Sequence, residues 1–181
     1  MNLETGNARG AKSAARNAMN DLRLRTARQR LVNSRDEADA IEGLREIVAN
    51  LLGCEEIGLF RIDRASASFK VCWSFGIDLE NYDLLRAIGD TAFRQLMNGE
   101  SYIDSGHNRG VPAAKAQAFI PIRFANQTVG ILAILRLLPQ KIAFDRSDME
   151  LFKLISDEAA KPLFGSSASF KAAASQGPGS K

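Results

Sequence analysis

The chain has 181 residues, of which 45% are hydrophobic and 25% charged, with two cysteines and one histidine. This composition predicts one globular domain with its own core, and it excludes a wholly disordered chain, a collagen repeat and a disulfide scaffold. The longest apolar run, Val129 to Leu135, is too short to cross a bilayer, and the N-terminus lacks the apolar stretch of a secretory signal. We expect a cytoplasmic protein, and Cys54 and Cys72 fit a reducing compartment at least as well as a single disulfide.

Basic residues are concentrated at the N-terminus, where the first 35 positions hold eight Lys and Arg against only Glu4 and Asp21. We interpret residues 1–33 as a basic, partly helical arm that is frayed over about its first 20 positions. A solvated basic helix is the simplest interpretation, and nucleic acid or an anionic membrane are alternative partners. The arm lacks aromatic residues and any DNA-binding motif, which makes nucleic acid an unlikely partner and favours contact with a protein.

Apolar residues at helical spacing predict helices before the first strand. Leu24, Ala27 and Leu31 step by three and four residues, and the same spacing continues from Ala38 to Leu51. Ser34 and Glu37 match a capping box, so a helix is expected to start at residue 35 and to end at Gly53. The segment 20–33 is either a separate helix or runs into this one.

Two strands and a hairpin turn follow this helix. Residues 56–63 are rich in apolar side chains, and a period of two then predicts a half-buried strand that ends at Gly76. The short connection between the two strands predicts antiparallel pairing. The alternating residues on one face of the second strand are Phe69, Val71, Trp73 and Phe75.

The second half of the chain also contains a helix followed by strands. A helical stripe from Leu84 to Met97 precedes a short strand at 101–104 and an exposed loop at 105–112. Residues 116–124 and 128–137 predict a second hairpin, whose later strand is apolar on both faces as a central strand would be. Pro121 has no amide to donate, which indicates a bulge or an edge-facing position.

The last helix has the clearest boundary signals. Asp145 fits its N-cap and Asp148 its third position, while Phe144 and Met149 fit a hydrophobic staple. Residues 165–181 are small and polar, and we interpret them as a disordered tail. The element order predicts an α+β domain over residues 34–164, with an antiparallel sheet and helices on one face.

Four stretches in this order resemble a known family: residues 55–63, 89–101, 119–134 and 144–152. They are similar to the strands, the central passage and the closing helix of GAF domains, a small-molecule sensor fold related to PAS domains. The resemblance covers residues 36–162. It implies a central antiparallel sheet of about five strands, with the N- and C-terminal helices packed on one face and a ligand pocket on the other. Gly130, in a strand interior, marks a close approach or a bend.

The resemblance also implies sites. The pocket would lie under residues 84–113, and our hypothetical ligand-binding residues are Trp73, Phe75, Arg86, Arg94, His107, Arg109 and Lys115. Ordinary surface charges and core aromatics are the alternatives for these residues. Related domains commonly form dimers through their terminal helices, so the hypothetical dimer or partner contacts are Leu24, Leu31, Ile41, Leu44, Leu151 and Ile155.

We expect no catalytic and no metal site. His107 is the only histidine available as a base, and phosphate-binding and nucleophile motifs are absent. Related domains bind cyclic nucleotides, linear tetrapyrroles, haem or small aromatic effectors, but the cyclic-nucleotide signature and the bilin-attaching cysteine are missing here, so the cofactor stays unassigned. A GAF-type methionine sulfoxide reductase using Cys54 and Cys72 is a weaker alternative, because residues 106–115 lack the cysteines of that family's loop.

The resulting expectation is a stand-alone, non-catalytic sensory or regulatory domain. It would be a homodimer that binds a small molecule, a signalling partner protein, or both. The alternative is a degenerate scaffold that serves only protein–protein contact, its pocket filled by bulky side chains such as Trp73 and Phe119.

Overall fold

The computed structural model describes residues 4–63, 66, 68–80, 82–104 and 116–165. Five strands form one sheet in the order β2-β1-β5-β4-β3, and every neighbouring pair is antiparallel. The strands are β1 (Cys54–Asp63), β2 (Ser68–Phe75), β3 (Tyr102–Ile103), β4 (Ala118–Phe124) and β5 (Gln127–Leu137). The predicted α+β class, its five strands and both hairpins are confirmed.

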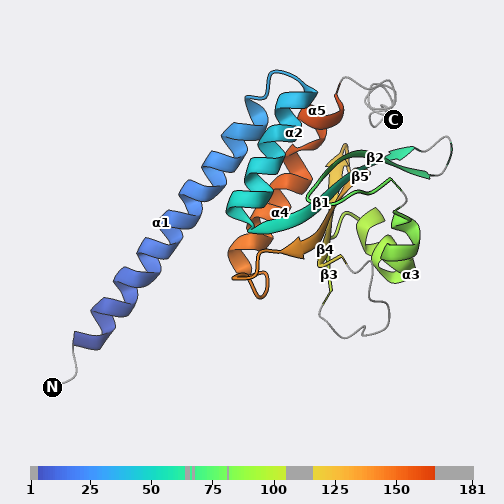
Figure 1. Cartoon of the computed structure of the whole chain (residues 1–181). Helices are drawn as coiled ribbons and strands as arrows, with labels where there is room; N and C mark the ends of the chain where they lie inside the picture. The colour runs from blue at the N-terminus through green and yellow to red at the C-terminus, as the bar shows by residue number, and fades with distance from the viewer. Residues whose placement is uncertain (1–3, 64–65, 67, 81, 105–115, 166–181) are drawn as a thin grey trace, which may run out of the picture.

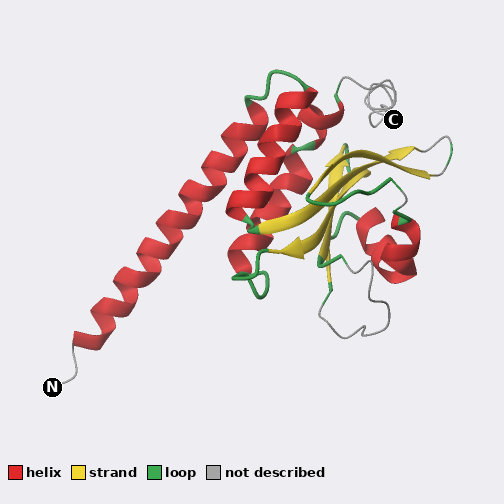
Figure 2. Cartoon of the chain, in the orientation of Figure 1, coloured by secondary structure: helices red, strands yellow, loops and turns green. Residues whose placement is uncertain are grey.

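Helices cover both faces of this sheet unequally (Figures 1 and 2). One face carries α1 (Glu4–Val32), α2 (Glu37–Glu46) with its π-helical continuation η1 (Ile47–Leu51), α4 (Arg146–Glu158) and α5 (Ala160–Phe164). Across the described residues, the other face carries one helix, α3 (Leu84–Met97). None of the described helices combines the length and the hydropathy that a bilayer span needs.

The sheet therefore separates two hydrophobic cores. The larger core joins Ile57 and Leu59 of β1 to the side chains of α1, α2, α4 and α5. The smaller core joins Phe60 of β1 and Phe119 of β4 to α3. Alternate residues of the central strands enter opposite cores, which explains why β5 reads as apolar on both faces.

The first helices differ from the expectation in where they begin. α1 is helical from Glu4, although the arm was expected to be frayed over about its first 20 positions. α1 and α2 are separate helices, and the helix predicted to start at residue 35 starts at Glu37 instead. The Asp36 carboxylate caps it by accepting from the Asp39 amide at 2.8 Å. The predicted capping role of Ser34 is wrong, because the chain is still turning away from α1 there and its Oγ donates to the Arg30 carbonyl at 3.0 Å.

Strand β2 contains an irregularity that its sequence pattern hides. Leu59 pairs with Trp73 but the next residue of β1, Phe60, pairs with Val71, so Cys72 is an extra residue in β2. A bulge of this kind reverses which face the following side chains occupy. Phe69 accordingly packs into the smaller core, whereas Trp73 and Phe75 pack against the larger one.

The structure explains the presence of Gly130 and Pro121 in the second hairpin. A Cβ on Gly130 would lie 2.7 Å from the Phe164 ring and 2.8 Å from the Phe60 carbonyl oxygen, so the close approach expected at this glycine is present. β3 pairs only with Ala118 and Phe119 of β4, so at Pro121 no described strand lies on the outer side of β4. The missing amide of the proline is tolerated there.

Helix α4 begins as its sequence predicts. The Asp145 carboxylate accepts from the amides of Ser147 and Asp148, and the Asp148 carboxylate accepts from the Asp145 amide, which completes a capping box. Phe144 and Met149 both pack against the larger core, and the Phe144 ring meets the Phe152 ring edge-to-face at 4.9 Å. This start places Asp148 beneath α1.

Candidate functional site

The α3 face of the sheet is lined by aromatic and small side chains. Phe60 and Phe119 are buried there beside Ala92 and Ala133. Four partly buried aromatic residues pack against this core: Phe69, Phe93, Tyr82 and Tyr102. Burial raises the pKa of the Tyr82 phenol to about 12, so it is an uncharged hydroxyl at neutral pH. Together these side chains form a packed, largely apolar core between α3 and the sheet.

Helix α3, which closes this face, is bent near its start. Gly89 has φ +68° and ψ 167°, a conformation that divides α3 into two short segments. The Asp83 carboxylate caps the first segment, and the second is tied to β5 by a buried hydrogen bond from Thr128 Oγ1 to the Leu96 carbonyl at 2.6 Å. The helix is thus fixed at both ends and bent between them.

The opposite face is organised around one arginine of α1. Arg23 donates to Asp148 at 2.9 Å, to Ser147 Oγ at 2.8 Å and to the Leu51 carbonyl at the end of η1. The Asp148 carboxylate is 1% exposed and also pairs with Lys141 Nζ at 2.7 Å. A single guanidinium therefore joins α1 to the end of one helix and the start of another.

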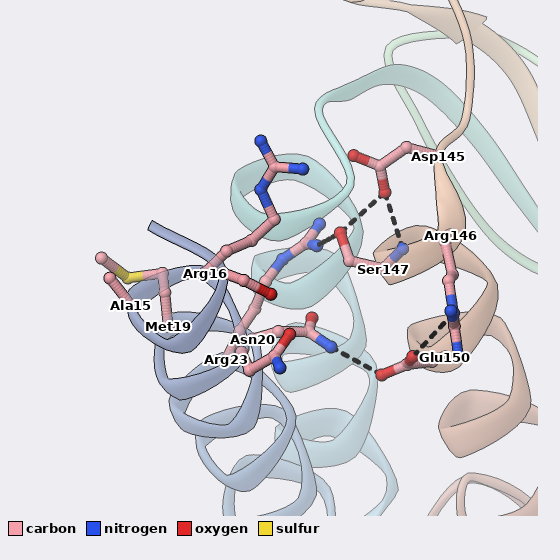
Figure 3. A pocket seen from close by; sticks show the side chains of 11 residues that line it. Ala15, Arg16, Met19, Asn20, Arg23, Asp145, Arg146, Ser147 and Glu150 are labelled. Atoms are coloured by element: carbon pink, nitrogen blue, oxygen red, sulfur yellow. Dashed lines mark hydrogen bonds and ion pairs between the residues drawn. The ribbon is translucent and has the colours of Figure 1, made fainter. Parts of the chain in front are cut away.

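A groove of about 1040 Å³, lined by polar residues together with Ala15 and Met19, lies between α1 and the start of α4. Figure 3 shows Asn20 and Arg23 of α1 reaching toward Glu150 and Ser147 of α4, with Arg16 further along α1. Asn20 Nδ2 donates to Glu150 at 2.6 Å, while its Oδ1 is buried without a hydrogen-bond partner among the described residues. The polar contacts of this groove hold α1 in place and leave most of its lining charges open to solvent.

Comparison with solved structures identifies this architecture. The chain is similar to the GAF domain of a phosphoenolpyruvate-protein phosphotransferase from Coxiella burnetii, with a TM-score of 0.63 and 20% identity over 87% of this chain and 99% of that one. The fold is that of a GAF domain. The corresponding Acinetobacter domain gives a TM-score of 0.56 at 18% identity, covering 78% of this chain and 93% of that one.

A third similar structure comes from another class of protein. It is the GAF domain of a two-component sensor histidine kinase from Bacillus halodurans, with a TM-score of 0.52 and 16% identity over 69% of this chain and 92% of that one. Comparisons with models of protein families and with curated proteins gave no match. The GAF fold is therefore shown by three-dimensional shape.

Within this GAF fold, the two predicted aromatic site residues lie on the helical side of the sheet. Trp73 and Phe75 stack with ring centroids 6.3 Å apart, and the Arg45 guanidinium of α2 lies 5.4 Å from the Phe75 ring centroid. The bulge at Cys72 puts them there, so they face α2 and not α3. Of the two bulky side chains that the scaffold alternative invoked, only Phe119 lies on the α3 face.

The predicted basic site residues are not gathered around a pocket in the part that the structure describes. Arg86 and Arg94 are exposed on α3, and Arg94 Nε donates to the Asp90 carbonyl of the same helix at 3.4 Å. His107, Arg109 and Lys115 lie outside the described residues. The ligand-binding assignment of all five stays a prediction.

The six predicted contact residues are used inside the chain. Leu31, Leu44, Leu151 and Ile155 have no exposed surface, and Leu24 and Ile41 pack against the same core. In this conformation they dock α1, α2 and α4 on one another, so a second protein would have to use other surfaces of these helices. Their spacing correctly indicated a buried stripe but not what buries it.

The two cysteines have the properties of core residues. Burial raises the pKa of the Cys54 thiol to about 12 and also raises that of Cys72, so both are protonated at neutral pH. Cys54 begins β1, whereas Cys72 lies opposite Leu59 and Phe60 of the same strand. At ~3.3 Å per residue the two cysteines are about 17 Å apart along the sheet, beyond the ~7 Å between Cα atoms that a disulfide allows. Both observations disfavour the reductase alternative.

Sequence reasoning did not single out the polar anchor of α1. The sequence pattern assigned no role to Asn20 or Lys141 and placed Arg23 only among the basic residues that flank the apolar stripe, although Arg23 adjoins the partly buried Leu24. An arginine on the docked face of a predicted helix is the signal that would have found it. No group of three or more acidic, cysteine or histidine side chains capable of holding a metal occurs in the described ranges.

Proposed function

We propose that this chain is a regulatory module of the GAF fold that acts without catalysis. It would bind a small, largely apolar effector on the α3 face and pass the resulting change to a partner protein or a second copy through α1. The similar structures are GAF domains of a phosphoenolpyruvate-protein phosphotransferase and of a two-component sensor histidine kinase. These relationships support a regulatory role by analogy of fold alone.

One observation carries the proposal: the sheet is a single layer shared by two separate cores. Phe60 packs against α3 while its neighbour Leu59 packs against the helices of the other face. A shift of β1 caused by a molecule beneath α3 would therefore be felt directly by the layer that holds α1. Coupling of this kind needs a ligand with different affinity for two arrangements of the sheet.

The scaffold alternative retains a specific observation in its favour. The α3 face already contains the bulky Phe60 and Phe119 side chains, which occupy space that a ligand would need. Under this alternative the chain would contact proteins through its helices and would respond to no small molecule. The two functions differ in one measurable property, the response to effectors.

Trp73 makes the test sharp, since it is the only tryptophan and lies on the face opposite α3. The purified chain would be titrated with cyclic AMP, cyclic GMP, biliverdin, haemin and benzoate. Thermal stability would report binding, and the Trp73 emission would report change in the helical layer. We expect one class of compound to raise the midpoint of unfolding and to shift the Trp73 emission together.

Two variants locate the response. Tyr82→Phe alters the α3 face and is expected to weaken the thermal shift, whereas Phe75→Leu alters the opposite face and is expected to leave it in place. Haemin and biliverdin absorb Trp emission, so for these two compounds circular dichroism replaces fluorescence. A chain whose stability and spectra respond to none of these classes would support the scaffold alternative.

A further inference from the structure

A row of basic positions runs along one side of helix α1. At 100° per residue, positions 9, 12 and 16 fall within about 40° of Arg23, the residue that docks α1 on α4. The sequence has arginine at 9 and 16 and lysine at 12. Glu4 is the one acidic residue among the first 20, and its position lies about 100° around the helix from Arg23. The docked side of α1 therefore continues toward the N-terminus as a basic row.

The domain leaves this row uncovered. Every described side chain from Ser13 to Met19 is exposed, and Figure 1 shows this half of α1 extending beyond the rest of the fold. Arg16 lines the groove between α1 and α4, but no interaction joins it to the other residues drawn in Figure 3. Arg23, by contrast, is already bound to Asp148. The α1 wall of the groove thus offers a free positive charge at Arg16.

The acidic residues of the opposite wall are bound within the domain. The Asp145 carboxylate accepts hydrogen bonds from two amides of the first turn of α4. Glu150 accepts from Asn20 at 2.6 Å and lies 3.9 Å from Arg146, whose own side chain is 96% exposed. Arg146 therefore reaches solvent beside the groove, and both walls present positive charge to an incoming molecule.

We propose that this groove binds an acidic, helix-forming segment of a partner protein, which lies along α1. The proposal rests on the partner contact through α1 proposed above and names the chemistry of that partner. The basic row repeats every three to four residues, so a helix laid beside it with carboxylates at the same spacing would pair with it, Arg16 included. Ala15 and Met19 line the same groove and provide apolar contact for the segment.

The charges of the groove favour such a segment over other occupants. The α1 helix of a second copy would bring the same basic row into the groove, so like charges would meet. A nucleic acid has a phosphate about every 1.7 Å along its duplex and would place some of them against Asp145 and Glu150. A peptide can present carboxylates to α1 alone and neutral side chains to the α4 wall, which makes it the complementary partner.

Fluorescence anisotropy of a labelled peptide tests the occupant. The probe is a helix-forming peptide of about 15 residues with glutamate at every third or fourth position and alanine, leucine and glutamine elsewhere. The same peptide with lysine in place of glutamate is its control. We expect saturable one-to-one binding of the glutamate peptide to the whole chain in about 50 mM salt, weakened roughly tenfold at about 500 mM. A chain that does not bind the glutamate peptide, or that binds both peptides equally, overturns the proposal.

A matched pair of variants tests the surface. Arg16→Glu reverses the free charge in the groove, and Arg25→Glu reverses an exposed arginine of the same helix, about 200° around it from Arg23. Both variants change the charge of α1 equally, so a general attraction to the basic arm would weaken equally in both. We expect Arg16→Glu to weaken peptide binding about fivefold more than Arg25→Glu, with the helical circular dichroism of both variants unchanged. Equal weakening overturns the proposed groove.

Two further measurements identify a different occupant. A labelled oligothymidine of similar length replaces the peptide in the same assay, and tighter binding of the oligonucleotide would assign the basic row to nucleic acid. Sedimentation at the assay concentrations reports the oligomeric state. A native dimer that Arg16→Glu dissociates would mean that a second copy fills the groove. Either result overturns the proposal.

The two proposals fail separately. Effector binding depends on the α3 face, so a chain that gains thermal stability with an effector but ignores the glutamate peptide contradicts only the acidic partner. A chain that binds the peptide through Arg16 but responds to no effector contradicts only the sensory role.

Discussion

The guanidinium of Arg23 lies 2.9 Å from the carboxylate of Asp148, which is 1% exposed. The two residues are 125 positions apart, and their contact closes the N- and C-terminal helices into one layer. Lys141 balances the second oxygen of the same carboxylate at 2.7 Å. Two cations around one buried carboxylate leave no uncompensated negative charge, which is the condition under which such a group is tolerated in a core.

Removing Arg23 should therefore cost more than removing an exposed arginine of the same helix. Arg23→Met leaves Lys141 as the one described cation beside Asp148 and places an apolar side chain against the Leu51 carbonyl. We expect the free energy of unfolding to fall by about 2–4 kcal/mol. Arg16→Met, on the exposed part of α1, should change it by less than about 0.5 kcal/mol. Urea unfolding at one fixed protein concentration measures both, and equal losses would contradict the anchor role.

Gly89 offers a test of backbone conformation without crowding. A Cβ at this position would meet nothing within 4 Å, but φ +68° with ψ 167° is accessible almost only to glycine. Gly89→Ala should lower the free energy of unfolding by about 1–3 kcal/mol. Thr91→Ala, on the exposed side of the same helix, serves as the control and should have little effect. An unchanged stability for Gly89→Ala would show that α3 can straighten freely.

Gly130 tests crowding without backbone strain. Its Cβ would lie 2.7 Å from the Phe164 ring and 2.8 Å from the Phe60 carbonyl oxygen. We expect Gly130→Ala to cost about 1–3 kcal/mol through overpacking. Phe164→Leu removes the ring, so the double variant should lose less than the sum of the two single losses. Strictly additive losses, measured by denaturant unfolding, would contradict the proposed clash between the ring and residue 130.

The buried thiol of Cys54 predicts a loss of stability at alkaline pH. Its pKa is raised from 9.0 to about 12 by burial, so the unfolded chain releases this proton before the folded chain does. Stability is then lost as pH rises above 9, by about 2–3 kcal/mol at pH 11 from this group. Tyr82, raised to about 12, adds to the fall at higher pH.

The matching experiment compares the native chain with Cys54→Ala across pH 7–11. Both chains lose stability from their other groups, so the informative quantity is the difference between them. That difference should favour the native chain near pH 7 and shrink as the pH rises above 9. Parallel curves over the whole range would mean that the Cys54 thiol titrates normally in the folded state.

Local signals made much of the fold predictable. The cap of α4 was predicted correctly because Asp145 and Asp148 satisfy amides only two and three residues away. The hairpins followed from a period of two and short connections. The capping role predicted for Ser34 was wrong because its hydroxyl turns back to the Arg30 carbonyl at the end of α1, and the Asp36 carboxylate caps α2 in its place.

The site was less predictable because it depends on packing between distant elements. One extra residue at Cys72 moved Trp73 and Phe75 to the other face of the sheet, and a single-residue bulge has no clear mark in an alternating sequence. Periodicity showed that Leu31 and Leu151 are buried, but both an internal core and a dimer interface produce that pattern. The partner of Arg23 is 125 residues away, where local patterns contain no information.

The sheet divides the molecule into two cores, and this division also predicts which part of the native state unfolds locally first. The α3 core is the smaller one, and Thr128 contributes one buried hydrogen bond that secures its helix. The helical side has a larger core together with the ion pairs of Arg23 and Arg30. The two sides should therefore behave as separate cooperative units, with the amides of α3 exchanging with solvent through a low-energy partial opening and those of α4 only near global unfolding. Such a hierarchy leaves the interior beneath α3 transiently accessible while the rest of the domain keeps its shape.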